Sequence, residues 1–160
     1  MNTAIVYYSM SGNTAYVAEK LAAALNADLI PLIPRKAYPD SGFKKFFRGG
    51  KSALMGDKPA LEPYDLDPNA YDLVIFGSPV WAGTFAPPLR SFIEDNRDSL
   101  RGKRFAAFFC CSGGPGKVLE KFKTFLACNR LEQELILIDP KDKPSPETEE
   151  MIKGYLDALR

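Results

Sequence analysis

The sequence predicts an α/β fold in which a doubly wound, five-stranded parallel sheet carries helices on both faces. Short apolar runs rich in β-forming residues alternate with segments whose apolar residues recur at helical spacing. No β-hairpin signal separates these runs, so we expect crossover helices between parallel strands. The chain has 160 residues and 46% hydrophobic content, enough to bury a full core. We therefore expect one domain over residues 1–160.

The first predicted elements form a strand, a helix and a second strand. Ile5–Tyr8 is short and apolar, as is typical of a strand that is covered on both faces. From about Thr14 to Leu25, apolar residues recur every four positions and predict a helix that packs on the sheet. Leu29–Ile33 reads as the second strand. Because Pro31 lacks the N–H that a central strand needs, we expect this strand at a sheet edge.

An irregular excursion follows at about residues 35–70. One short helix is expected over residues 41–54, after which prolines at 59, 63 and 68 favour extended or turned chain. Its first part, residues 35–58, is basic, with Arg35, Lys36, Lys44, Lys45, Arg48, Lys51 and Lys58 against Asp40 and Asp57. Two interpretations stay open. The excursion is a solvated loop whose Phe43, Phe46 and Phe47 pack on the core, or a basic, aromatic flap that covers a ligand or docks an acidic partner.

The second half of the chain returns to regular alternation. Its predicted elements are a central strand over Tyr71–Gly77, a helix from Pro87, a strand over Arg104–Cys111, a helix from Lys117 to about Asn129, a strand over Leu135–Ile138 and a helix over Glu147–Leu159. Ser145 precedes the last helix as a capping residue.

Composition excludes several classes of function. The formal net charge is +1 and the pI is about 7.6, so whole-chain charge favours neither nucleic acid nor an anionic membrane surface. The sequence shows no leader pattern and no apolar run of membrane-spanning length, which makes the cytoplasm the expected location. The chain has no His, the commonest general base and metal ligand, so no metal site is predicted.

The three cysteines do not form a disulfide framework. Cys110 and Cys111 are adjacent in a predicted strand, and Cys128 lies in a predicted helix. We expect reduced, packed thiols. A redox role for the adjacent pair is the alternative, although neighbours in a strand point to opposite faces.

The first of three unusual loops follows the first strand. Ligands bind at the carboxyl ends of the strands in open α/β sheets, and here the chain reads Ser9, Met10, Ser11, Gly12, Asn13 and Thr14. Small hydroxyl residues and a Gly before a helix direct backbone N–H groups at an anion. The segment contains no Lys or Arg, which excludes a Walker A loop and favours a monophosphate held by neutral donors. An ordinary helix entrance with capping residues is the alternative.

Two further loops follow the third and fourth predicted strands. The loop over residues 78–84 contains a large flat Trp81 between Pro79 and Gly83. A core position is the commoner fate of a lone Trp, but a turn is a poor place from which to reach the core, so we expect Trp81 at the ligand site. The loop over residues 112–116 is rich in Gly, which lets backbone approach a ligand closely. Together the three loops predict a flat aromatic nucleotide with a single phosphate.

These loops carry a resemblance that extends over the whole chain. The segments Ser9–Thr14, Gly77–Trp81 and Ser112–Gly114 resemble those of the flavodoxin-like family. The resemblance implies a flavodoxin-like three-layer sandwich and FMN bound without a covalent link. It places the phosphate against residues 9–14 and the ring between residues 79–83 and 112–116. The residues expected to bind the cofactor are Ser9, Met10, Ser11, Gly12, Asn13, Thr14, Ser78, Pro79, Val80, Trp81, Ala82, Gly83, Ser112, Gly113, Gly114 and Gly116.

Three features depart from the electron carriers of that family. Those carriers are strongly acidic, whereas this chain is balanced in charge. Ala82 stands where they commonly have a Gly, and a side chain makes a positive-φ turn more costly. The third loop lacks the aromatic that covers the outer face of the ring in many carriers, which leaves that face open to a nicotinamide or a quinone.

The sequence therefore leaves three candidate functions. The first is electron transfer between redox partner proteins, and the flavin's own chemistry makes the lack of His no obstacle. The second is an FMN-dependent NAD(P)H oxidoreductase acting on a quinone or another small acceptor. The third is a receiver-like module, which is disfavoured because Ser9, Ser78 and Ser112 stand where its carboxylates would be. The redox partner and the oligomeric state stay open.

Overall fold

The computed structural model describes residues 1–38, 50–53 and 55–160. Its sheet has five parallel strands in the order β2-β1-β3-β5-β6, which confirms the predicted α/β fold class. The strands are β1 (Thr3–Tyr7), β2 (Asp28–Pro31), β3 (Leu73–Trp81), β5 (Arg104–Cys111) and β6 (Glu134–Ile138). Strand β2 lies at one edge of the sheet, as Pro31 predicted.

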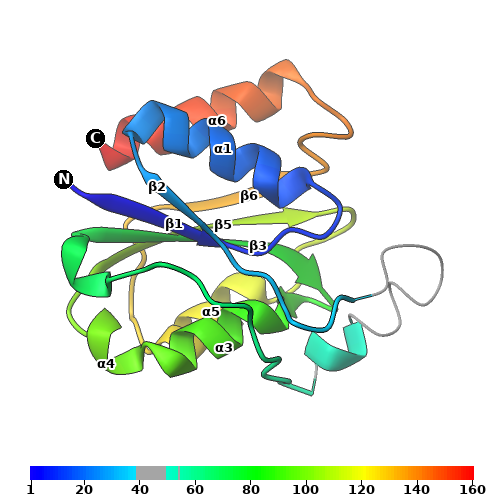
Figure 1. The fold of residues 1–160 in the computed structure, drawn as a ribbon. Coiled ribbons are helices and arrows are strands. Elements are labelled where there is room, and N and C mark those ends of the chain that lie inside the picture. The colour runs from blue at the N-terminus through cyan, green and yellow to red at the C-terminus, as the bar shows by residue number, and fades with distance from the viewer. Residues whose placement is uncertain (39–49, 54) are drawn as a thin grey trace.

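Helices cover both faces of the sheet (Figure 1). Helices α1 (Asn13–Leu25) and α6 (Pro146–Leu159) pack side by side on one face, and α3 (Pro87–Asp95) and α5 (Val118–Leu126) lie on the other. Two shorter elements are α4 (Arg97–Leu100) and the 3₁₀ turn η1 (Pro68–Ala70). The Ser145 cap of α6 is confirmed, because its hydroxyl accepts a hydrogen bond from Thr148 N at 3.1 Å.

The second loop differs from the sequence prediction because it is a β-hairpin. Strand β3 continues to Trp81 instead of ending at Gly77, and it pairs with the antiparallel β4 (Thr84–Phe85). Ala82 and Gly83 connect the two strands with φ values of 51° and 71°. Positive φ at both central residues is the requirement of a type I′ turn. The expectation of no hairpin was wrong because Asn-Gly and Asp-Gly are the usual signals, and Ala-Gly is neither.

The excursion leaves the sheet after β2, and its returning arm runs beside its outgoing arm. Arg35 N donates to Ala60 O at 2.9 Å, and Glu62 N donates to Ile33 O at 2.7 Å, so the two arms pair with each other. Residues 50–53 are helical, within the helix expected over 41–54. Positions 39–49 and 54, which include the three phenylalanines of the predicted flap, lie outside the described residues.

The topology opens a crevice between β1 and β3. From β1 the chain passes outward to β2, then crosses back to β3 on the other side of β1. At such a reversal the connections from neighbouring strands lead to opposite faces of the sheet, leaving room at the carboxyl ends. Within the described ranges, no helix is both long and apolar enough to cross a membrane.

Candidate cofactor site

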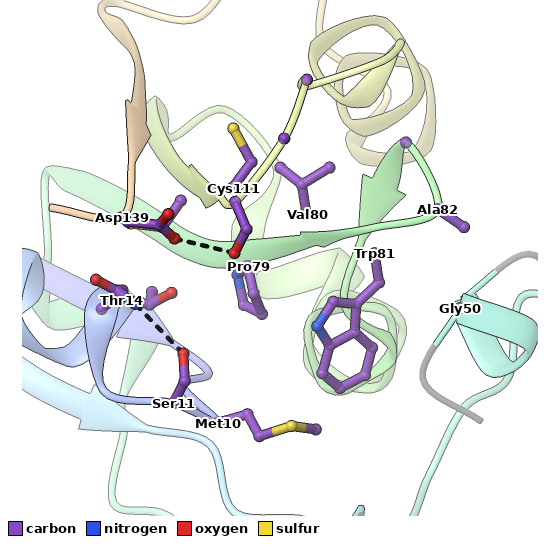
Figure 2. Close-up of a pocket in the computed structure, with 16 residues that line it drawn as sticks. Met10, Ser11, Thr14, Gly50, Pro79, Val80, Trp81, Ala82, Cys111 and Asp139 are labelled. Carbon is purple, nitrogen blue, oxygen red and sulfur yellow. Dashed lines mark hydrogen bonds between the residues drawn. The ribbon is translucent and has the colours of Figure 1, made fainter. Parts of the chain in front are cut away.

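A cavity of about 360 Å³ lies at the carboxyl ends of β1, β3 and β5 (Figure 2). Its volume is within the range of about 300–1,000 Å³ that is typical of small-molecule sites. Most of the predicted residues meet there: Met10, Ser11, Asn13, Thr14, Pro79, Val80, Trp81, Ala82, Gly83, Ser112, Gly113 and Gly114. Their role in binding a cofactor stays a prediction.

The first loop turns the chain from β1 into α1 within five residues, 8–12. Gly12 closes the turn with φ of 97°, a value that favours Gly. The N–H groups of the first turn of a helix lack intrahelical partners, and they carry the positive end of the helix dipole. Ser9 Oγ is buried, and no group within the described residues hydrogen-bonds to it. The loop therefore offers donors to an anion at the start of α1.

Asn13 and Thr14 are buried at the first positions of α1. Asn13 Oδ1 accepts hydrogen bonds from Lys141 N at 2.8 Å and from Asp142 N at 3.3 Å. Its amide Nδ2 donates to Asp142 Oδ2 at 2.9 Å and, more weakly, to Ser11 Oγ at 3.4 Å. Asn13 thus connects the segment after β6 to the first loop through hydrogen bonds. Its side chain therefore has a structural role in addition to any contact with a ligand.

The hairpin β3–β4 presents Trp81 to the cavity. The indole is half-buried, and its ring centroid lies 5.6 Å from that of Tyr8 and 5.1 Å from that of Tyr38, both in edge contact. Figure 2 shows Trp81 and Ala82 on one side of the cavity, across from Ser11 and Thr14. Burial, and then the neighbouring Tyr38, raise the pKa of Tyr8, which stays a neutral phenol. The aromatic edges hold the indole in place while it lines the cavity.

Ser78 lies beneath the hairpin, where its side chain is fully buried. Its hydroxyl donates to Pro79 O at 2.7 Å and accepts from Ala86 N at 2.8 Å. Both bonds are internal to the hairpin connection. Ser78 therefore shapes the loop and is not among the residues that line the cavity.

The third loop contains two glycines with open space beside them, Gly113 and Gly114, and one glycine, Gly116, that packs against the second loop. A Cβ added at Gly113 or Gly114 would meet nothing within 4 Å among the described residues. At Gly116, with φ of 55°, a Cβ would lie only 2.7 Å from Gly83 Cα. Gly116 is outside the cavity lining, as are Ser9 and Gly12, and its lack of a side chain lets the second and third loops touch.

Asp139 is a lining residue that the sequence analysis missed. It directly follows β6 with φ of 42° and is only 8% exposed. Ser112 Oγ donates to its Oδ1 at 2.9 Å, and Lys143 Nζ lies 3.2 Å from its Oδ2. Among the described lining residues it alone carries a charge. Its place at the carboxyl end of a strand was a usable signal, because the rule that found the other loops applies to it equally.

Gly50, Cys110 and Cys111 complete the lining, and none of them was predicted there. Both thiols are buried and free, as expected of packed cysteines. Burial raises the pKa of Cys110 to about 12 and also raises that of Cys111. Cys111 Sγ donates to Leu137 O at 3.7 Å. Because the thiolate is the reactive form, neither thiol is activated at neutral pH.

A second cavity of about 660 Å³ lies within the excursion, and its described lining comes from residues 35–38 and 51–60. Four cationic side chains line it, Arg35, Lys36, Lys51 and Lys58, together with Asp57 and Tyr38. Tyr38 therefore joins the two cavities, since its ring also contacts Trp81.

The sequence profile of the family described as Flavodoxin matches residues 2–133. A flavoprotein from Lactobacillus acidophilus NCFM, solved in complex with FMN, superposes with a TM-score of 0.71 at 24% identity, covering 94% of this chain and 97% of that one. A protein from Bacteroides eggerthii DSM 20697 gives 0.74 at 27% identity, with 99% and 97% covered. The two-electron reduced flavodoxin of Megasphaera elsdenii gives 0.59 at 17% identity, with 97% and 98% covered.

Proposed function

This chain belongs to the flavodoxin family, and we propose that it carries electrons between redox partner proteins on a flavin held in the cavity beside Trp81. The observation that supports this proposal most is the meeting of two different features in one cavity. A turn that directs unpaired donors outward from the start of α1 lies on one side, and an indole in edge contact with two tyrosines lies on the other.

The cofactor is FMN, as the family resemblance implied. The residues fit this group. The phosphate loop has a buried hydroxyl at Ser9 that pairs with no described group, and a positive-φ glycine that leaves no side chain over the turn. A monophosphate supplies the acceptors that these donors lack, because buried polar groups in native proteins are almost always paired. When bound, FMN supplies one- and two-electron chemistry.

The protein's own residues then have separate tasks. The phosphate would be bound by the hydroxyls of Ser9, Ser11 and Thr14 and by the first N–H groups of α1. Trp81 and the neighbouring hairpin would pack against the ring and exclude water from it. The exposed Gly113 and Gly114 would let backbone approach the ring from the third loop. Asp139 would keep negative charge near the cofactor, which disfavours an anionic flavin and lowers its potential.

A second candidate, an FMN-dependent NAD(P)H oxidoreductase acting on a quinone or another small acceptor, is favoured by the second cavity. Its four cations match the negative charge of a dinucleotide's phosphates. Tyr38, which lines that cavity and contacts Trp81, would connect a dinucleotide there to the flavin site.

The kinetics of reduction distinguish the two candidates. The protein is loaded with FMN and mixed anaerobically with NADH or NADPH in a stopped-flow instrument, with photoreduction as the control for a redox-active flavin. The carrier proposal expects slow reduction by either nucleotide and full reduction by light. Rapid direct reduction by a nucleotide would contradict the carrier and favour the oxidoreductase. Failure to take up FMN would contradict both.

We further propose the cytoplasm as the location. The three free cysteines support it, because reduced thiols persist in a reducing compartment.

A further inference from the structure

Lys141 lies across the phosphate loop, although it is far from that loop in the sequence. A Cβ added at Gly12 would lie 2.7 Å from Lys141 Nζ and 3.5 Å from its Cδ. The lysine side chain therefore occupies the space that the missing Gly12 side chain leaves open. The loop contains no cation of its own, but the fold places one against the turn.

The backbone of Lys141 is held in place by the same loop. Asn13 Oδ1 accepts hydrogen bonds from the N–H groups of Lys141 and Asp142, at 2.8 and 3.3 Å. Asn13 itself is 7% exposed and fixed at the start of α1. The lysine thus starts from an anchored backbone, which reduces the entropy lost when its side chain binds an anion.

The neighbouring acids are engaged elsewhere. Asp139 lies 3.2 Å from Lys143 Nζ and accepts from Ser112, while Asp142 accepts from Asn13 Nδ2 at 2.9 Å. Within the described part of the chain, the Lys141 ammonium makes no ion pair. A cation with no counter-ion among the described residues thus lies beside a turn whose other donors are neutral.

We propose that Lys141 is the counter-ion of the FMN phosphate and the residue that selects phosphorylated flavin over riboflavin. This inference rests on the proposed binding of FMN at the loop. The interaction is a charge-assisted contact at an exposed lysine, so its strength depends on ionic strength. Neutral donors alone would bind the phosphate with little dependence on salt.

The test compares FMN and riboflavin affinities of apoprotein variants by quenching of flavin fluorescence. Lys141→Gln removes the charge, and Lys141→Arg restores it. Lys153→Gln makes the same change of net charge at an exposed position of α6 and serves as the matched control. We expect Lys141→Gln to raise the Kd for FMN about fivefold at low ionic strength, the scale of one exposed charge pair. The Kd for riboflavin should stay the same, and high salt should reduce the difference.

The outcomes separate this inference from the proposed function. Equal weakening of both flavins by Lys141→Gln would show a structural role and overturn the inference, and so would no change in either. An effect of Lys153→Gln as large as that of Lys141→Gln would show that the change in affinity comes from net charge alone. This result would also overturn the inference. Wild-type protein that binds neither flavin would instead contradict the proposed function, on which the inference rests.

Discussion

Ser11 is the position where a new charge tests the phosphate loop most cleanly. It is exposed, lines the cavity and makes one weak hydrogen bond, so Ser11→Asp should fold normally. A carboxylate there would repel the phosphate, and we expect FMN affinity to fall at least about thirtyfold, or about 2 kcal/mol. Flavin fluorescence titration measures the change, with Ser11→Ala as the uncharged control. An unchanged Kd for Ser11→Asp would show that the phosphate binds elsewhere.

Asn13 is a poorer choice for the same test. A carboxylate at this position would face Asp142 at the distance of the present 2.9 Å hydrogen bond. Lost affinity could then arise from a displaced loop after β6 instead of from repulsion of the phosphate.

Ala82 occupies a backbone conformation that suits Asn better. Its φ is 51°, and its side chain is exposed at the first central position of the hairpin turn. Asn tolerates this region and forms the preferred Asn-Gly turn with Gly83. We expect Ala82→Asn to raise the free energy of unfolding by about 0.5–1 kcal/mol, measured by urea denaturation of the apoprotein. A loss of stability would contradict the positive-φ turn.

At the residue scale, the sequence predicts positions that follow local rules and misses those that depend on tertiary contact. Trp81 and the hydroxyls of the first loop were predicted from their place after a strand. Gly50 reaches the site from a distant segment, and no local pattern marks it. Lys141 lies in the connection after β6, but only the structure shows that its side chain fills the space beside Gly12. Gly77 has a packing reason that only the structure shows, because a Cβ there would lie 2.2 Å from Phe108 Cζ.

At the scale of elements, the contact between two loops determines the shape of the site. Gly116→Ala would place a methyl group 2.7 Å from Gly83 Cα, at a position with positive φ. We expect it to destabilise the apoprotein by about 2 kcal/mol and to weaken FMN binding by separating the loops.

Gly113→Ala is the matched control for that change. It adds the same methyl group in the same loop, with nothing described within 4 Å. Its unfolding free energy should stay within about 0.5 kcal/mol of the wild-type value. Equal unfolding midpoints for the Gly116 and Gly113 variants would contradict a tight contact between the loops.

The regular elements were predictable because, in each of them, the spacing of apolar residues and the length of the segment indicate the same type of secondary structure. All five parallel strands and the helices α1, α3, α5 and α6 occupy the predicted stretches, with ends shifted by a few residues. Strand β4 was missed because it has only two residues and an unusual turn. The short α4 was also missed, since four residues carry too little periodicity to be detected.

At the scale of the whole molecule, a buried thiol and a buried phenol make the free energy of unfolding depend on pH in the alkaline range. Burial raises the pKa of Cys110 from 9.0 to about 12, and it raises that of Tyr155, which is 4% exposed. Between pH 9 and 12 the unfolded chain releases the Cys110 proton while the folded chain keeps it. The free energy of unfolding should therefore fall with rising pH, by about 1.4 kcal/mol per pH unit for each such group.

Urea denaturation across this pH range checks the effect. Cys110→Ala should lose the contribution of one group to the slope, whatever its effect on stability near neutral pH. Identical slopes for wild type and variant would contradict a protonated, buried Cys110.

The overall architecture was predictable because one pattern of alternation runs through most of the chain. The excursion between β2 and β3 does not share that pattern, and its sequence left both a solvated loop and a functional flap open. The arms of the excursion pair with each other, and its cations line the second cavity. Whether that cavity binds a ligand depends on tertiary contacts that periodicity does not encode.

The position of bound FMN is tested most directly by a crystal structure of the complex. We predict the phosphate within hydrogen-bond distance of Ser9 Oγ and of the first N–H groups of α1, with the ring against Trp81. A phosphate located away from residues 9–14, or a ring that does not contact the indole, would contradict the account.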